Sequence, residues 1–191
     1  MIPDSPPTEI SITPLIRGSE FSDWKSLNDT IMGGSSFASC STSDKGLFLE
    51  GNIIEEGGGF VSCRSPIFDK PFDLSPYSGL ILDVEGEGRT LKFAIAGEKK
   101  PLSLSNLLKG DVRWVASIPT KKNGVSRIKI PFKAFEPARR AMPVRLPVSF
   151  DPTCINRFQL LHSKFGQPGK MNLGFVAGPI KVLIKSLSAY S

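Results

Sequence analysis

The chain has 191 residues, of which 40% are hydrophobic and 13 are phenylalanine, enough for one domain with a substantial core. No apolar run approaches the ~18 residues that a membrane-spanning helix needs, and no secretory signal follows Met1. These features argue against helical membrane spans and secretion, and they favour an intracellular protein.

The net charge of +6 is unevenly distributed along the chain. Residues 1–95 hold 7 Lys/Arg against 14 Asp/Glu, whereas residues 96–191 hold 17 against 4. We therefore expect a basic patch on loops of the second half, facing anionic lipid headgroups, RNA or an acidic protein surface. Its candidate members are Lys121, Lys122, Arg139, Arg140 and Arg145. The alternative is a solvated basic surface with no dedicated partner.

The pattern along the chain is that of an all-β protein. The start is rich in proline, and we expect 1–18 to be a flexible N-terminal segment before a single domain over 19–191. Alternating apolar and polar residues predict half-buried antiparallel strands. The expected strands are 36–43, 47–54, 59–65, 80–85, 91–95, 112–119, 128–132, 155–163, 171–176 and 180–184. The longest predicted helix is one or two turns over 103–108. About nine or ten short strands favour an antiparallel β-sandwich of the jelly-roll type over a closed barrel.

Two glycine-rich segments stand apart from this regular pattern, and the first covers residues 24–36. Asn and Asp side chains cap tight turns, and glycine permits backbone conformations that other residues avoid. The segment is therefore interpreted as an irregular path held by a few polar contacts, with direct recognition as the alternative. The residues assigned to it are Trp24, Asn28, Asp29, Met32, Gly33, Gly34 and Ser35.

The second segment covers residues 57–65 and is expected to lie beside the first. Its assigned residues are Gly58, Gly59, Phe60 and Arg64. Arg64 lies on a predicted strand, and we expect it to contact Asp29 or the backbone carbonyls of residues 28–34. A bidentate arginine–carboxylate pair would hold the irregular segment on the sheet.

Signals for catalysis, metals and cofactors are weak. His162 is the only histidine, lies on an alternating strand without a recognisable nucleophile nearby, and is interpreted as a satisfied core or rim residue. Cys40, Cys63 and Cys154 are odd in number and widely spaced, which predicts reduced thiols in a reducing compartment. We therefore assign no catalytic residue, metal ligand or cofactor; a structural calcium ion at Asp29 stays open as an alternative.

The ordered combination of motifs resembles one family. Residues 24–35 resemble the opening motif of the complex I intermediate-associated protein 30 family, and residues 58–65 resemble its second motif. Three later stretches follow in the same order, namely Asp73–Leu80, Gly86–Arg89 and Ile130–Pro137. The resemblance thus extends over almost the whole chain.

The resemblance implies a jelly-roll sandwich similar to galactose-binding and carbohydrate-binding modules, and a non-enzymatic role in building membrane electron-transfer complexes. Family members assist assembly of respiratory complex I or act in photosystem biogenesis, including at messenger RNA. We therefore expect a scaffold or assembly factor that binds a protein subunit or assembly intermediate, peripheral to a membrane, in a bacterial cytoplasm or plastid stroma. The alternatives, in order, are a carbohydrate-binding module, an RNA-associated biogenesis factor and an enzyme.

Overall fold

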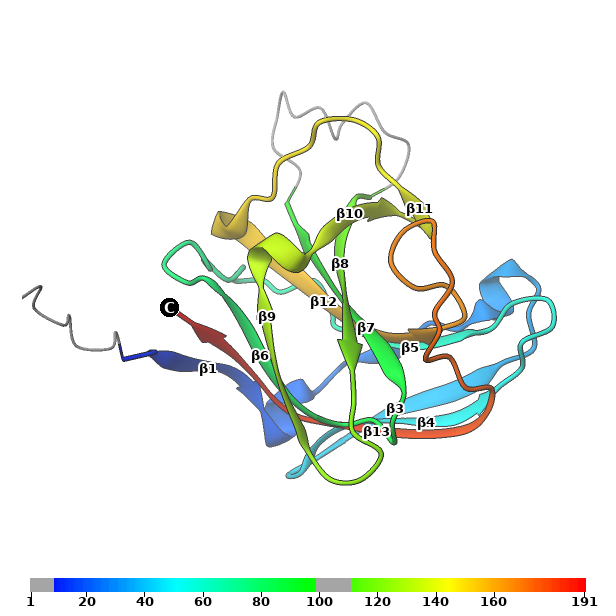
Figure 1. The fold of residues 1–191 in the computed structure, drawn as a ribbon. Helices are drawn as coiled ribbons and strands as arrows, with labels where there is room; N and C mark the ends of the chain where they lie inside the picture. The colour runs from blue at the N-terminus through cyan, green and yellow to red at the C-terminus, as the bar shows by residue number, and fades with distance from the viewer. Residues whose placement is uncertain (1–8, 99–110) are drawn as a thin grey trace, which may run out of the picture.

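Two antiparallel β-sheets pack face to face in the computed structural model, which describes residues 9–98 and 111–191 (Figure 1). Sheet A has the strand order β3-β4-β13-β6-β9, with β1 also paired to β13. Its strands are β1 (Ile12–Arg17), β3 (Phe37–Ser43), β4 (Gly46–Ile53), β6 (Gly79–Glu85), β9 (Ser126–Pro131) and β13 (Gly178–Tyr190). The predicted antiparallel β-sandwich is confirmed.

Sheet B has the strand order β11-β10-β8-β7-β12-β5-β2. Its strands are β2 (Lys25–Ser26), β5 (Phe60–Arg64), β7 (Thr90–Gly97), β8 (Arg113–Pro119), β10 (Glu136–Arg139), β11 (Met142–Pro143) and β12 (Ile155–Ser163). Short 3-10 turns complete the described residues, without an α-helix among them: η1 (Gly18–Phe21), η2 (Asp29–Met32), η4 (Phe132–Ala134) and η5 (Pro152–Cys154). The helix expected over 103–108 lies outside the described residues.

The main core fills the space between the sheets. Leu82 and Val182 from sheet A and Phe93 and Phe158 from sheet B belong to one buried cluster, each at most 1% exposed. Because side chains alternate along a strand, the neighbours of these residues on sheet B point to its opposite face. We call this the outer face of sheet B. It carries a second, smaller buried cluster of Ala94, Val115, Ala138 and Leu161.

Two sequence predictions about the fold are wrong. The N-terminal segment 1–18 is not wholly outside the sandwich, because β1 pairs with the C-terminal strand β13 and buries Ile16. The strand expected over 171–176 is a loop instead, held by the Asn172 side chain, whose Nδ2 donates to the carbonyls of Thr90 and Ser163 at 2.9 Å each. Local alternation predicted a strand there, but the segment has no ladder of partners and Leu173 is fully exposed.

Candidate functional site

The two glycine-rich segments meet at the carboxylate of Asp29, which is fully buried. Its Oδ1 accepts the backbone N–H of Ser36 at 2.9 Å, and its Oδ2 accepts those of Gly59 at 2.7 Å and Phe60 at 3.3 Å. The carboxylate therefore ties the first segment to the start of β5, and the expected adjacency of the two segments is confirmed.

Two glycines make room for this carboxylate. A Cβ built on Gly34 would lie 2.4 Å from Asp29 Cγ, and one built on Gly58 would lie 2.4 Å from Asp29 Oδ2. Any larger residue at either position would push the carboxylate away from its donors. Gly34 and Gly58 are thus explained by close approach to one side chain, whereas Gly33 and Gly59 have φ of +86° and +96°, a conformation that favours glycine.

The electrostatics of Asp29 follow from these contacts. Burial alone raises the pKa of the carboxyl group, but the hydrogen bonds from Ser36, Gly59 and Phe60 outweigh it and hold the pKa below its ordinary value of 3.8. N–H donors surround both oxygens, so this geometry does not support a calcium ion at Asp29. Among the described residues, no three His, Cys, Asp or Glu side chains cluster as metal ligands would.

The expected contact of Arg64 with Asp29 is wrong. Arg64 lies at the far end of β5, where its backbone pairs with Lys25 and Gln159, and its side chain lies on the outer face of sheet B. Asp29 instead binds backbone amides at the near end of the same strand. Every residue except proline has a backbone N–H, so the sequence could not identify these donors. The prediction therefore chose Arg64, the cation of the second segment.

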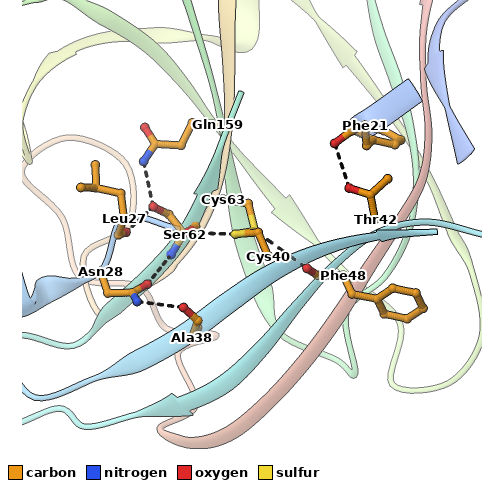
Figure 2. Close-up of a disulfide and its surroundings, with 10 residues drawn as sticks. All are labelled: Phe21, Leu27, Asn28, Ala38, Cys40, Thr42, Phe48, Ser62, Cys63 and Gln159. Carbon is orange, nitrogen blue, oxygen red and sulfur yellow. Dashed lines mark hydrogen bonds between the residues drawn. A yellow bond between two sulfur atoms is a disulfide. The ribbon is translucent and has the colours of Figure 1, made fainter. Parts of the chain in front are cut away.

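A second set of contacts joins the sheets beside Asp29 (Figure 2). Asn28 Nδ2 donates to the carbonyl of Ala38 on β3 at 3.0 Å, and its Oδ1 accepts the N–H of Ser62 on β5 at 3.4 Å. Trp24 is 5% exposed and packs edge-on against Phe21. These residues hold the fold together.

A disulfide between Cys40 of β3 and Cys63 of β5 crosses the sandwich at this point, with a Cα–Cα distance of 5.8 Å (Figure 2). The prediction that these two cysteines are reduced is therefore wrong, and the cysteines no longer give a reason to expect a reducing compartment. The two cysteines are 23 residues apart, and only the packing of sheet A on sheet B brings them together. Cys154 is a free cysteine.

The exposed part of the first segment includes two large apolar side chains. Met32 is 67% exposed and its neighbour Ile31 is 65% exposed, and Gly33 and Ser35 are exposed as well. The buried half of the segment is thus structural, and the exposed half offers two large apolar side chains.

The outer face of sheet B carries the main concentration of buried polar chemistry. Arg64 lies opposite Gln159, Leu161 opposite Lys92, and Ala138 opposite Arg113. Residues directly opposite in an antiparallel pair share a face, and so do residues two apart on one strand. Arg64, Lys92, Arg113, Arg157 and Gln159 therefore share this face; we call them the cationic cluster.

Contacts within the cationic cluster link it to the glycine-rich segments. Arg113 Nη1 donates to Gln159 Oε1, and Gln159 Nε2 donates to Ser62 Oγ at 3.0 Å. The Ser62 hydroxyl donates in turn to the carbonyl of Leu27 in the first segment. One hydrogen-bonded chain thus runs from the first segment to Arg113.

The charges of the cluster repel one another. Burial first, and then the charge of Arg113, lowers the pKa of Lys92 to about 8. Burial and then the charge of Arg64 lower the pKa of Arg157, while Asp111 acts in the opposite direction. Lys92 is only 8% exposed. A recessed group of like charges costs stability, and a group of this kind is a candidate for a functional site.

The basic loops expected from the sequence do not form one surface. Lys121 and Lys122 lie in the turn that follows β8, whereas Arg139 and Arg140 lie at the β10–β11 turn, beyond the first residue of β8. The two pairs therefore flank opposite ends of β8, and Arg145 is an exposed residue after β11. Sequence reasoning missed Lys92, Arg113 and Arg157. Lys92 had one signal, a charged residue within the apolar run of β7.

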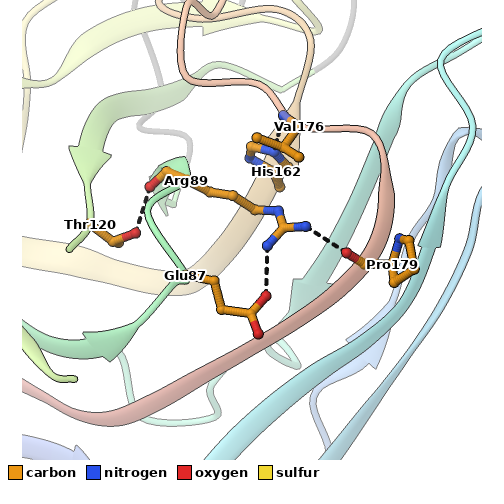
Figure 3. Close-up of polar contacts among 6 residues, drawn as sticks. All are labelled: Glu87, Arg89, Thr120, His162, Val176 and Pro179. Atoms are coloured by element: carbon orange, nitrogen blue, oxygen red, sulfur yellow. Dashed lines mark hydrogen bonds and ion pairs between the residues drawn. The ribbon is translucent and has the colours of Figure 1, made fainter. Parts of the chain in front are cut away.

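His162 is a buried structural residue, as predicted. Its Nε2 accepts the N–H of Val176 at 3.1 Å (Figure 3), so the proton of the neutral ring lies on Nδ1. Nδ1 donates to the Thr90 carbonyl at 3.1 Å. Beside it, Arg89 bridges Glu87 and the carbonyl of Pro179. These contacts hold the segment between β12 and β13 against sheet B.

Acidification is expected to destabilise the fold through His162. Burial first, and then the charge of Arg89, lowers its pKa to about 4 from 6.5, so the unfolded chain binds a proton that the folded chain excludes. Stability is complete above pH 6.5 and falls as the pH approaches 4, with a loss of about 2 kcal/mol between pH 7 and pH 5. Urea unfolding at both pH values measures this loss. His162→Gln should remove most of the pH difference; an unchanged difference would contradict the assignment.

Comparisons with known proteins agree with this architecture. A profile of the Complex I intermediate-associated protein 30 (CIA30) family matches residues 15–175. No curated protein matches the chain in sequence. Among the residues that the structure describes, no helix has the length and apolar character needed to cross a bilayer.

Solved structures of similar fold include the family 11 carbohydrate-binding module from Clostridium thermocellum in complex with a beta-1,3-1,4-mixed-linked tetrasaccharide. It is 17% identical, with a TM-score of 0.61 over 93% of this chain and 94% of that chain. The family 11 module of the cellulase Lic26A-Cel5E of the same organism has the same identity and TM-score, covering 94% of each chain. At this identity the likeness shows the fold alone. The family profile matches most of the chain, and the chain therefore belongs to the Complex I intermediate-associated protein 30 family.

Proposed function

We propose that this protein is a non-catalytic assembly factor for a membrane electron-transfer complex of the respiratory complex I or photosystem type. It would bind a protein subunit or an assembly intermediate, in contact with the membrane surface. The family match over residues 15–175 carries the proposal, since the family is associated by name with complex I intermediates. The recessed cationic cluster supports it by offering a charged face for a partner.

Two other functions predict different behaviour. A carbohydrate-binding module is supported only by fold likeness to proteins of 17% identity, and neutral sugars would bind with little dependence on salt. An RNA-associated factor would use exposed aromatic residues for stacking beside its basic groups. Trp114 and Phe150 contact each other and pack against the core cluster.

The test is capture of partners by the tagged protein from solubilised membranes and from soluble extract. Protein, RNA and glycan are identified in the same preparation. We expect subunits of one membrane complex, with capture weakening between 0.1 M and 1 M salt because the Debye length falls from about 10 Å to about 3 Å. Tight glycan binding that ignores salt, without a protein partner, would overturn the proposal in favour of the carbohydrate module.

The intracellular setting remains a proposal of its own. Reducing compartments keep most thiols reduced, so the Cys40–Cys63 pair reports on the environment. Rapid alkylation of intact cells, followed by mass spectrometry of both cysteines, would show which state is present. Fractionation of the same cells would show whether the protein accompanies the membrane.

A further inference from the structure

We propose that the cationic cluster on the outer face of sheet B is an anion-binding site that receives the carboxylates of an acidic, extended segment of a protein partner. This inference rests on the proposed function and deepens it by naming the surface and the chemistry that the partner must present. It depends on three observations: the spacing of the cations on one face, the lack of internal partners for Lys92 and for one arginine nitrogen, and the preset orientation of Arg113.

The first observation concerns spacing. The four cations come from adjacent strands, Arg64 from β5, Arg157 from β12, Lys92 from β7 and Arg113 from β8. Neighbouring strands are about 4.8 Å apart, so the cluster extends roughly 14 Å across the sheet. A single phosphate ion reaches only two or three such groups. An extended peptide with an acidic residue at every second position places three carboxylates over about the same span.

The second observation is the lack of internal partners. Lys92 is 8% exposed, and no hydrogen bond or ion pair to its ammonium group exists within residues 9–98 and 111–191. Arg157 Nε is buried without a hydrogen-bond acceptor over the same residues. Buried donors are normally satisfied, so the unsatisfied Nε of Arg157 points to an external acceptor. Asp111 acts electrostatically on Arg113 and Arg157 and has an interaction of its own.

The third observation is preorganisation. Gln159 accepts a hydrogen bond from Arg113 and is itself fixed by Ser62, which is anchored to Leu27 of the first glycine-rich segment. The guanidinium of Arg113 is thereby held in place before a ligand arrives, which lowers the ordering cost of binding. The glycine-rich segments, structural in themselves, position this site.

The surroundings of the cluster define one end of the site. A small pocket lies between Thr90 and Ser117 and the loop of residues 166–174. Ser117 is the cross-strand neighbour of Lys92, so this loop bounds the face beside the buried ammonium group. The pocket lining includes Lys170, which adds to the positive character of this end.

Direct binding of a defined probe tests the site. The probe is a ten-residue peptide of alternating Glu and Gly, and its control replaces every Glu by Gln. Isothermal titration should detect the Glu peptide alone. In Arg64→Gln with Arg157→Gln, binding should weaken at least about tenfold. The matched control removes two charges elsewhere, as Lys121→Gln with Lys122→Gln, and should stay within about twofold. Equal loss in both variants would overturn the site, because it would show a general charge effect.

Proton uptake gives a second readout that a structural role would not produce. At pH 8 Lys92 is about half protonated. Carboxylates that keep its ammonium group charged should therefore cause the uptake of at most about half a proton per chain on binding. Titrations in two phosphate-free buffers of different ionisation enthalpy measure this uptake. The charged and titratable groups that interact electrostatically with Lys92 are Arg113 and His162; Arg64 and Asp111 act on Arg113 in turn.

Lys92→Met should bind more weakly and take up no proton, while its thermal unfolding stays cooperative, since the ammonium group has no hydrogen bond or ion pair within the described residues to lose. Unchanged proton uptake in this variant would contradict the site. Binding of poly-uridine RNA without binding of the Glu peptide would overturn the proposal in favour of RNA.

The same variants separate this inference from the proposed function. If wild type captures subunits of a membrane complex and Arg64→Gln with Arg157→Gln captures them equally well, the site is wrong and the assembly role stands. If wild type binds the Glu peptide at the cluster but captures no such subunit, the anion site stands and the assembly role falls.

Discussion

Replacing Asp29 with alanine is expected to lower the free energy of unfolding by about 3–5 kcal/mol, because each buried donor left unpaired costs about 1–3 kcal/mol. The carboxylate accepts backbone N–H groups from Ser36, Gly59 and Phe60 and is fully buried. Water has little access to these donors once the side chain is gone. Urea unfolding followed by tryptophan fluorescence measures the loss, since Trp24 is buried in the same segment.

Matched variants distinguish this network from a general loss of charge. Asp69 is exposed, and Asp69→Ala should change stability by less than about 0.5 kcal/mol. Gly58→Ala keeps the carboxylate but places a Cβ 2.4 Å from Asp29 Oδ2, so it should also destabilise the fold. Wild-type stability in Asp29→Ala would show that the two segments are held together by something else.

Reduction of the Cys40–Cys63 disulfide is expected to cost about 3 kcal/mol of stability, because the bond restricts the unfolded chain over a loop of this length. The cysteines are 23 residues apart and belong to opposite sheets. The carbonyl oxygens of Ser62 and Phe48 lie 3.6 Å and 4.0 Å from the sulfurs of Cys40 and Cys63. Each thiol of the reduced protein thus has an acceptor nearby, and the reduced sandwich should stay folded.

The measurement compares urea unfolding with and without dithiothreitol. Wild type should lose stability on reduction, whereas Cys40→Ala with Cys63→Ala should be insensitive to it and resemble the reduced protein. The free Cys154 remains in both proteins, so it serves as an internal control. Equal stability of the oxidised and reduced wild type would contradict a stabilising role for the bond.

Strand positions followed well from the sequence where one face of a strand is buried. The strand predicted over 155–163 matches β12, and that over 36–43 matches β3 within one residue. Alternation is a local property, so each strand reports its own burial. The same rule failed at 171–176, where alternating residues lie in a loop, and at β10, where Pro137 disguised a strand that pairs with β8.

Partner choices within the fold could not be predicted in the same way. The glycines and Asp29 indicated an irregular path, but the acceptor–donor pairing with the amides of Gly59 and Phe60 uses backbone atoms that every residue has. Arg64 was therefore matched to the wrong partner, although its strand was correct. The cysteine count likewise favoured free thiols, since a sequence separation of 23 does not reveal the short distance between β3 and β5.

Local sequence patterns were enough to assign the all-β class, the strand alternation and the two glycine-rich motifs, and the order of the motifs identified the family. Each of these depends on residues close together in the chain or on the order of motifs. The folded structure was needed to show that Lys92, Arg113 and Arg157 share one recessed face with Arg64, and that the basic turns around Lys121 and Arg139 lie at opposite ends of β8. Strand order and register set these neighbourhoods, and they arise from packing across the whole sandwich, which no local pattern encodes.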